Sequence, residues 1–485
     1  MTLLDHIVLT IYFCTVVLIG TRFSAGQKTL QEFFLGNRNI PWWAASLSGV
    51  ATVLSAVAYL GAPGQAYKAD LTYLQYRLAL PFAILLVCGL MIPYFYRMQV
   101  FTVYEYLERR FDLKTRLLGS AIFLVLKCCY MGVVIYAPSV FVAEITGFSL
   151  PFVIVVTGVL TALYTTLGGM RAVIWTDTFQ LFVLLGGLTA AALVIGIRLD
   201  GGWSEVFAVA GERQKLRFFD FSPSLTTEFT FLGGLIGGIF LMVSEYGTDQ
   251  ASVQRFLTTS SMRRGQWAVG SSMVISSCLG ALLFLVGTGL YVYYLEFADK
   301  GGIGLAPDRV FPKFIAEELP TGFRGLLVAS VLAAAMSTIS GVLNSLTTVV
   351  MVDFGQTLLQ RTSSVASARR VTFGLGICCT LFALFADRLG NLIVASAKLT
   401  SFFGGSLVGI FLLGMTARHV GGNAAFFGLL VGSAAVAVLS ASTAVSWMWY
   451  GAFSALTAYV AGLLFHLIEP RNTVKSVEQR ETVRG

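Results

Sequence analysis

Hydroxyl and small side chains are concentrated in one apolar segment, AAAMSTISGVLNS, at residues 333–345. Within it, Ser337 and Thr338 lie three and four positions after Ala334, and Gly341 lies three positions after Thr338, so a helix would present all four on one face. Oxygen atoms are the ligands that hard cations prefer, and this face could therefore hold such a cation. Small residues also enrich the interfaces between membrane helices, so the pattern alone leaves ion binding and helix packing both open.

Ionisable side chains inside apolar segments are the second group of candidates. Arg77, Lys127 and Lys398 fall within such segments, whereas Asp177 is the one acid that we place deep. A charge at membrane depth is costly and usually faces a cavity or a partner, and an anionic substrate would supply the missing charge. Arg77 has the fork geometry that binds a carboxylate, although its position near a helix end also allows a snorkelling anchor.

The elements that must position these residues are membrane-spanning helices. Of 485 residues, 56% are hydrophobic and 12% are charged, and the mean hydropathy is +0.78. Because a spanning helix needs about 20 apolar residues, we expect an all-α membrane protein with about 13 transmembrane helices. The candidate segments are 4–22, 42–61, 72–97, 117–147, 151–168, 173–198, 228–249, 267–295, 322–355, 371–388, 391–416, 423–442 and 445–468.

The distribution of Lys and Arg between alternate loops predicts the orientation. With the N-terminus outside, twenty cations, Arg255 among them, lie on inner loops and the tail, and ten lie on outer loops. The positive-inside bias therefore favours a multi-pass protein of the cell membrane with its N-terminus outside and its C-terminus in the cytoplasm. The cations form no basic stripe, so the net charge of +8 reflects contact with a lipid bilayer and not with nucleic acid.

Two apolar segments are interrupted by glycine. LSGVATVLSAVAYLGAPG (47–64) belongs to the second expected helix, and FLGGLIGGIFLMVSEYG (231–247) belongs to the seventh. They stand at corresponding places in two five-helix units, a pattern that points to a transporter binding site between inverted repeats. Glycine as a packing spacer remains the alternative.

Several motifs together resemble the sodium:solute symporter family. They are QKTLQEFFLGNRNIPWWAASLS (27–48), TVYEYLERRFD (102–112), LYTTLGGMRAVIWTD (163–177), GTDQASVQRFL (247–257) and the segment 333–345. The resemblance covers nearly the whole chain. It implies a LeuT-type fold with two inverted repeats of five helices, one leading helix and two trailing helices. It also implies sodium-coupled symport by alternating access.

The resemblance divides the chain into six parts. These are 1–41, the leading helix and a cytoplasmic loop; 42–200, the first inverted repeat; 201–227, an extracellular loop; 228–416, the second inverted repeat; 417–468, the two trailing helices; and 469–485, a cytoplasmic tail.

The resemblance also implies the ion sites. The main sodium site would use the carbonyls of Ala51, Leu54 and Ala334 with the hydroxyls of Ser337 and Thr338. A second sodium site would use Asp177, Ser337 and Ser340, but Gly341 stands where a further serine is expected. Asp177 could instead cap the start of its helix, or carry a proton if protons replace sodium as the coupling ion.

The substrate site implied by the resemblance lies beside the first broken helix. Its residues would be Val53, Ser55, Ala58, Tyr73, Arg77 and Tyr130. Val53 and Ala58 offer few hydrogen bonds, so we expect a small, partly apolar carboxylate, such as a monocarboxylate or sialic acid. A neutral sugar, an amino acid or a vitamin is the alternative.

An intramembrane enzyme is a poor match to this sequence. His6, His419 and His466 all lie at expected helix ends, and neither H-E-x-x-H nor G-x-S-x-G occurs. A sensor would normally add a soluble signalling domain, and the pattern shows none. We therefore expect a transporter of a small molecule, with Na+ as coupling ion and no obligate protein partner.

Overall fold

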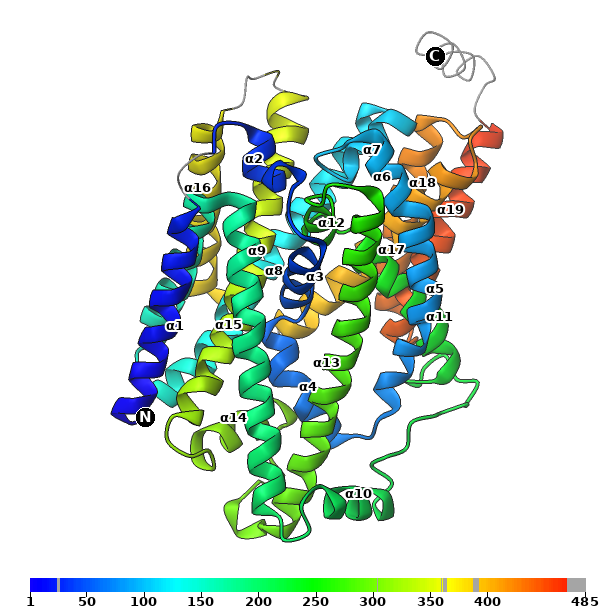
Figure 1. Cartoon of the computed structure of the whole chain (residues 1–485). Coiled ribbons are helices and arrows are strands. Elements are labelled where there is room, and N and C mark those ends of the chain that lie inside the picture. Colours follow the sequence, from blue (N-terminus) through cyan, green and yellow to red (C-terminus); the bar gives the residue numbers. More distant parts are fainter. Residues whose placement is uncertain (24–26, 303, 359, 361–363, 387–391, 469–485) are drawn as a thin grey trace.

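The chain folds into a bundle of helices (Figure 1). The computed structural model describes residues 1–23, 27–302, 304–358, 360, 364–386 and 392–468, without the side chains of 392–403. Every regular element within these residues is helical, which confirms the all-α class. The expected tail at 469–485 and the side chain of Lys398 lie outside the described residues.

The first half of the chain contains a broken helix, α3–α4, and a helix of 49 residues, α9. The bounds of its helices are α1 Leu3–Arg22, α2 Leu30–Leu35, α3 Trp42–Val53, α4 Ala56–Lys68, the 3₁₀ helix η2 Thr72–Ala79, α5 Leu80–Ile84, the π-helix η3 Leu85–Met91, α6 Ile92–Met98, α7 Tyr104–Arg110, α8 Leu113–Thr146, α9 Leu150–Arg198 and α10 Gly202–Glu212.

The second half repeats the pattern of one broken helix followed by long ones. Its bounds are α11 Phe231–Val243, the π-helix η4 Ser244–Thr248, α12 Gln250–Phe256, α13 Met262–Glu296, α14 Pro307–Glu317, α15 Phe323–Val349, η6 Val350–Gln356, α16 Val365–Leu384, α17 Leu392–Thr416, α18 Gly422–Ser442, the short 3₁₀ helix η8 Trp447–Trp449 and α19 Tyr450–Ile468.

The described helices give fewer candidate membrane spans than the thirteen that the sequence predicts. Ten are long and apolar enough to cross a membrane, or eleven if the bent pair α3–α4 is one span. However, α9 has 49 residues and contains both segments that the sequence separates, with a break at Gly169 (φ 54°, ψ −154°). Since one span needs about 20 residues, α9 has the length for two. The total of thirteen stays a prediction.

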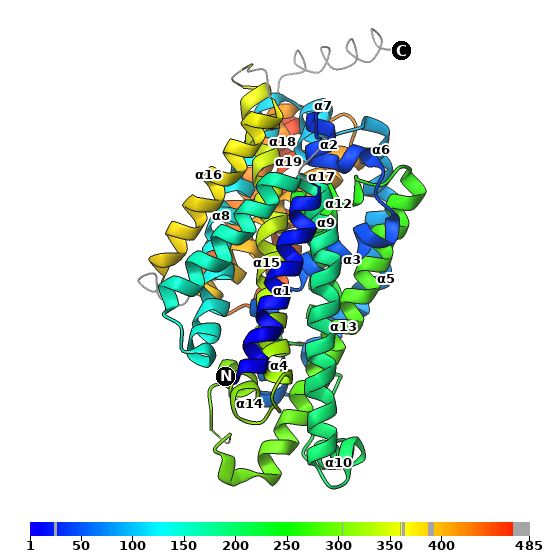
Figure 2. The same ribbon diagram turned by 60° about the vertical axis from the view of Figure 1, so that its left-hand side comes forward.

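The helices run roughly along one axis, with short elements at both ends (Figures 1 and 2). Helices α10 and α14 lie at the end where α1 begins, and α2, α7 and α12 lie toward the opposite end. Helix α19 ends on that opposite side. The described chain thus starts near one end of the bundle and finishes near the other, as an odd number of crossings requires.

Helix α15 forms the centre of the bundle. In its most apolar stretch 94% of residues are buried, compared with 28% for α1, and it packs against α9, α8, α3 and α4. The small residues that the sequence concentrates at 333–345 let neighbouring backbones approach closely. Packing therefore explains much of this composition, but it does not explain why so many of these residues carry hydroxyls.

The first broken helix consists of α3 and α4, whose axes differ by 64°. At the break, the Ser55 amide donates to the Val53 carbonyl at 3.0 Å, two residues back. An uninterrupted helix would direct that amide to Ala51. The Ser55 hydroxyl then caps α4 by accepting from the Ala58 amide at 3.3 Å. The chain therefore leaves the Ala51 carbonyl available to other partners.

The second broken helix consists of α11, η4 and α12. The π-helix η4 is followed by Asp249, whose backbone is extended (φ −79°, ψ 117°) and whose carboxylate accepts from the Ala251 amide at 2.9 Å. Both interruptions that the glycine-rich segments predict are thus present, each between two short helical arms.

Candidate functional site

Two hydroxyl groups on α15 face the break between α3 and α4. Ser337 Oγ donates to the Ala51 carbonyl at 2.8 Å, and Thr338 Oγ1 donates to the Thr52 carbonyl at 3.1 Å. Each hydroxyl also lies within 3.3 Å of the Ala334 carbonyl. The structure therefore brings together Ala51, Ala334, Ser337 and Thr338, four of the five residues that the resemblance implies for the main sodium site.

One member of the predicted set is arranged differently. Leu54 is buried at the break itself, but its carbonyl makes no hydrogen bond to α15 among the described residues. The carbonyl of Thr52 approaches α15 instead. Residue spacing does not reveal this difference, because the carbonyls that become available depend on where the helix stops.

This cluster has the chemistry of a site for a hard monovalent cation. Neutral carbonyl and hydroxyl oxygens converge on the end of a broken helix, and both hydroxyl side chains are at most 1% exposed. A hydroxyl carries two lone pairs besides its proton. Ser337 and Thr338 can therefore turn their protons away and present oxygen to a cation without any change in the backbone.

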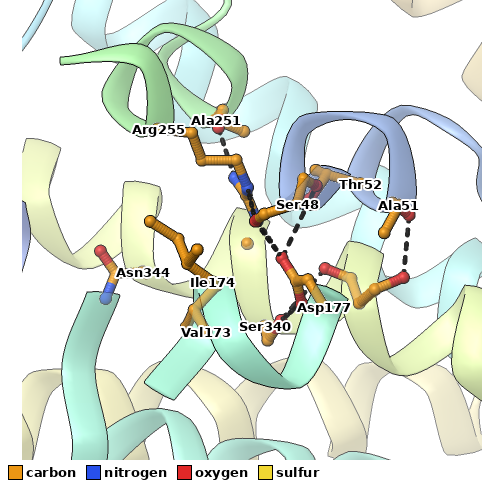
Figure 3. Close-up of polar contacts among 12 residues, drawn as sticks. Ser48, Ala51, Thr52, Val173, Ile174, Asp177, Ala251, Arg255, Ser340 and Asn344 are labelled. Carbon is orange, nitrogen blue, oxygen red and sulfur yellow. Dashed lines mark hydrogen bonds and ion pairs between the residues drawn. The ribbon is translucent and has the colours of Figure 1, made fainter. Parts of the chain in front are cut away.

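A buried ion pair lies next to this cluster (Figure 3). Asp177, on α9, accepts from Ser48 Oγ at 2.7 Å, from Ser340 Oγ at 3.1 Å and from Arg255 Nη2 at 3.0 Å. Arg255, on α12, also donates to Ser48 Oγ at 2.8 Å and to the Ala251 carbonyl at 2.5 Å. Both charged side chains are fully buried.

The place of Arg255 corrects the sequence analysis. The sequence pattern places it on an inner loop, but it lies inside the bundle as the partner of the deep acid. The residues of the expected second site do meet, since Ser340 Oγ contacts both Asp177 and the Ser337 carbonyl. The motif GTDQASVQRFL contains Arg255, but nothing in its spacing indicates which acid it would contact.

A cavity of about 130 Å³ lies beside the second break. Its wall is formed by residues from α8, the second broken helix, α17, η8 and the start of α19: Lys127, Tyr130, Gly237, Phe240, Leu241, Ser244, Glu245, Asp249, Gly405, Trp447, Met448 and Gly451. It is a partly open space with charged groups in a largely apolar wall. It lies where a helix is interrupted, which is a common place for ligand sites in transporters.

The charges in this cavity overturn part of the sequence argument. Lys127 forms an ion pair with Asp249, so it already has an acidic partner. Glu245 is a further acid at this depth: it lines the cavity and forms no hydrogen bond or ion pair with the described residues. Deep cations therefore do not outnumber deep acids in the described part of the chain.

The expected substrate residues divide into two groups. Tyr130 lines the cavity and lies beside the side chain of Ser55, which is at the break between α3 and α4. Val53 and Ala58 flank the α3–α4 break, and both are partly buried. Tyr73 is away from this space, because its ring stacks on Phe284 with centroids 5.1 Å apart.

Arg77 belongs with Tyr73 and not with the cavity. Its Nη1 donates to the Ser276 carbonyl on α13 at 3.2 Å, and its guanidinium lies 4.9 Å from the centroid of the Tyr76 ring. A Cβ added at Gly280 would overlap the guanidinium, so a glycine makes room for this arginine against α13. The cation that does face the cavity is Lys127.

Comparison with known proteins identifies the family of the chain. The sequence model of the sodium:solute symporter family matches residues 33–432. The chain is 29% identical to the sodium/sialic acid symporter SiaT of Proteus mirabilis, covering 95% of this chain and 94% of the relative. It is 32% identical to the human sodium-coupled monocarboxylate transporter 2, covering 88% of this chain and 71% of the relative.

A solved structure shows the same architecture. It is described as a substrate-bound outward-open state of a Na+-coupled sialic acid symporter that reveals a novel Na+ site. The match has a TM-score of 0.89 at 28% identity and covers 97% of this chain and 98% of the other. The fold is therefore of the LeuT type, and the chain belongs to the sodium:solute symporter family.

Proposed function

We propose that this protein is a sodium-coupled symporter that imports a small organic acid by alternating access. One observation carries the proposal: the hydroxyls of Ser337 and Thr338 on α15 face carbonyls set free by the break between α3 and α4. A cation bound there would hold the broken helix against α15. Sodium binding would in this way favour one arrangement of the two helices, which is what coupling to transport requires.

The cavity at the second break is the proposed substrate site. It lies beside Tyr130, which also contacts the region of the first break, so a solute there would touch both broken helices. Relatives that carry sialic acid or monocarboxylates support an organic anion as the substrate class. The cavity volume of about 130 Å³ suits a solute of few atoms, or one part of a larger solute.

Lys127 is the proposed contact for the carboxylate. An ammonium group has three donors, and one of them is taken by Asp249, so others can reach a solute in the cavity. Glu245 lines the same cavity and is an acceptor without a hydrogen-bonding partner among the described residues. We therefore propose a solute that bears a carboxylate for Lys127 and a hydroxyl or N–H donor for Glu245.

The substrate class can be tested by thermal stability of the purified protein. Any ligand that binds only the folded state raises its apparent stability. We expect small hydroxy acids or sialic acid to raise the melting temperature in sodium buffer, with a smaller effect in choline buffer. Uncharged sugars at equal concentration serve as the comparison. A sugar that stabilises the protein while every organic acid fails would contradict the proposed class.

Variants of the cavity separate the two contacts. Lys127→Gln should weaken binding of a stabilising hydroxy acid about ten- to hundredfold, because a charge-assisted hydrogen bond contributes roughly 1.5–3 kcal/mol. Glu245→Gln should weaken the hydroxy acid more than the same acid without its hydroxyl. Arg77→Gln, which removes a cation outside the cavity, is the matched control and should change affinity less than Lys127→Gln. A larger loss of affinity in Arg77→Gln than in Lys127→Gln would indicate that Arg77 binds the carboxylate.

The orientation in the membrane is also a proposal. The described chain begins and ends near opposite ends of the bundle, and the distribution of Lys and Arg favours the N-terminus outside. The burial of Arg255 removes one cation from the inner count without reversing that bias. Helices α10 and α14 would then face the outside, and α2, α7 and α12 would face the cytoplasm.

A further inference from the structure

The surroundings of Asp177 have the composition of a cation site. Its carboxylate contacts the hydroxyls of Ser48 and Ser340, and Thr52 Oγ1 lies 3.5 Å from the same oxygen that Ser48 contacts. A carboxylate with several hydroxyl oxygens is a donor set that a small hard cation binds well. The group that lies among these oxygens is the guanidinium of Arg255 (Figure 3).

The guanidinium is held at every nitrogen. Nε donates to Ser48, Nη1 donates to the Ala251 carbonyl, and Nη2 donates to Asp177. With both charged side chains at 0% exposure, water has no access to either group. A second positive charge beside this guanidinium would be repelled strongly, because burial lowers the effective dielectric constant.

Gly341 makes this arrangement possible. A Cβ at this position would overlap Nη2 of Arg255, so any larger residue would force the guanidinium away from Asp177. A serine here would both displace the arginine and add a hydroxyl to the oxygen cluster. One residue of α15 thus decides whether the space around Asp177 holds a side-chain cation or remains open to an ion.

We propose that Arg255 is a fixed internal cation that fills the Asp177 cluster, so that each chain binds one sodium ion and not two. Gly341 is the residue that admits it. The inference rests on the proposed sodium site at Ala51, Ser337 and Thr338, which provides the one ion. Arg255 is here a positioning residue that holds α12 to α9 through Asp177, and it excludes an ion by occupying the ion's place.

The test counts sodium ions bound to the purified full-length protein, with ²²Na⁺ alone as the probe. We expect one ion per chain and a hyperbolic binding curve. Two ions per chain would overturn the inference and leave the proposed main site intact. No bound sodium would instead contradict the main site, so the two failures are distinguishable.

A variant pair tests the role of Arg255 directly. Arg255→Gln combined with Gly341→Ser leaves Asp177 without its cation and adds a hydroxyl, so we expect a second sodium ion per chain. Asp177→Asn combined with Arg255→Gln removes both charges, and this control should bind one ion. A folded first variant, judged by size-exclusion profile, that still binds one ion would overturn the inference. If that variant does not fold, the count for the unmodified protein decides.

Discussion

At the residue scale, the proposed main ion site consists of neutral oxygens that form hydrogen bonds with one another. Ser337→Ala and Thr338→Ala should each raise the sodium concentration that gives half-maximal binding. Each removes one oxygen ligand. A hydrogen bond or contact to a charged group contributes roughly 1.5–3 kcal/mol, so the sodium concentration for half-maximal binding should rise about ten- to hundredfold. The same ²²Na⁺ assay measures the change.

Ser345→Ala is the control for this pair. Ser345 is also buried on α15, and its hydroxyl donates to the Gly341 carbonyl at 2.7 Å. It is two turns from the site, so its removal should leave sodium affinity close to that of the unmodified protein. Equal sodium affinity in all three variants would show that the ion binds elsewhere.

Residue spacing predicts some of the site and misses the rest for a physical reason. Ser337 and Thr338 are recognisable because a helix places them on one face. The partners Thr52, Arg255 and Asp249 are not recognisable, because their contacts join segments far apart in the sequence. The Asp177–Arg255 pair, for example, joins residues 78 positions apart. The surroundings of Arg77 are hidden for the same reason, since its guanidinium lies against Gly280 on another helix.

At the element scale, the breaks in helices position the chemistry. Gly169, inside α9, adopts φ 54° and ψ −154°, a backbone region that other residues reach only at a cost. Gly169→Ala should destabilise the protein by about 1–3 kcal/mol. An added Cβ would in addition lie 2.7 Å from the Phe33 carbonyl oxygen. The melting temperature of the purified protein should fall.

Gly374→Ala is the matched control for the backbone effect. Gly374 lies inside α16, and a Cβ there meets nothing within 4 Å. Alanine is preferred over glycine in a helix by about 1 kcal/mol, so this variant should be as stable as the unmodified protein or slightly more so. Equal destabilisation by both substitutions would contradict the importance of the Gly169 conformation.

Apolar length predicts most of these elements, but not their local geometry. The interruptions near 47–64 and 231–247 are signalled by glycine, and both are present. The 3₁₀ geometry of η2 and the π geometry of η3, η4 and η6 leave no mark in hydropathy, because all helix types bury the same apolar side chains. Of these segments, η2 carries Tyr73 and Arg77 and η4 carries Glu245, so hydropathy does not predict where these side chains point.

At the scale of the whole molecule, the proposed orientation can be tested by labelling cells. In a variant with its seven cysteines replaced by alanine, one new cysteine is introduced at Arg213 or at Arg263. Both residues are exposed. Arg213→Cys should react with a membrane-impermeant maleimide on intact cells, and Arg263→Cys should react only after permeabilisation. The opposite pattern would place the N-terminus inside.

The fixed guanidinium in the Asp177 cluster has an energetic consequence for transport. Arg255 and Asp177 together are neutral, so a cycle that carries one sodium ion and one monovalent acid moves no net charge. The membrane potential, which contributes about 2.3 kcal/mol per elementary charge at 100 mV, then does no work on the solute. A tenfold sodium gradient, about 1.4 kcal/mol, would concentrate the acid at most tenfold at any voltage. The concentration ratio of the solute across the membrane would then be limited by the concentration ratio of sodium and would not depend on voltage.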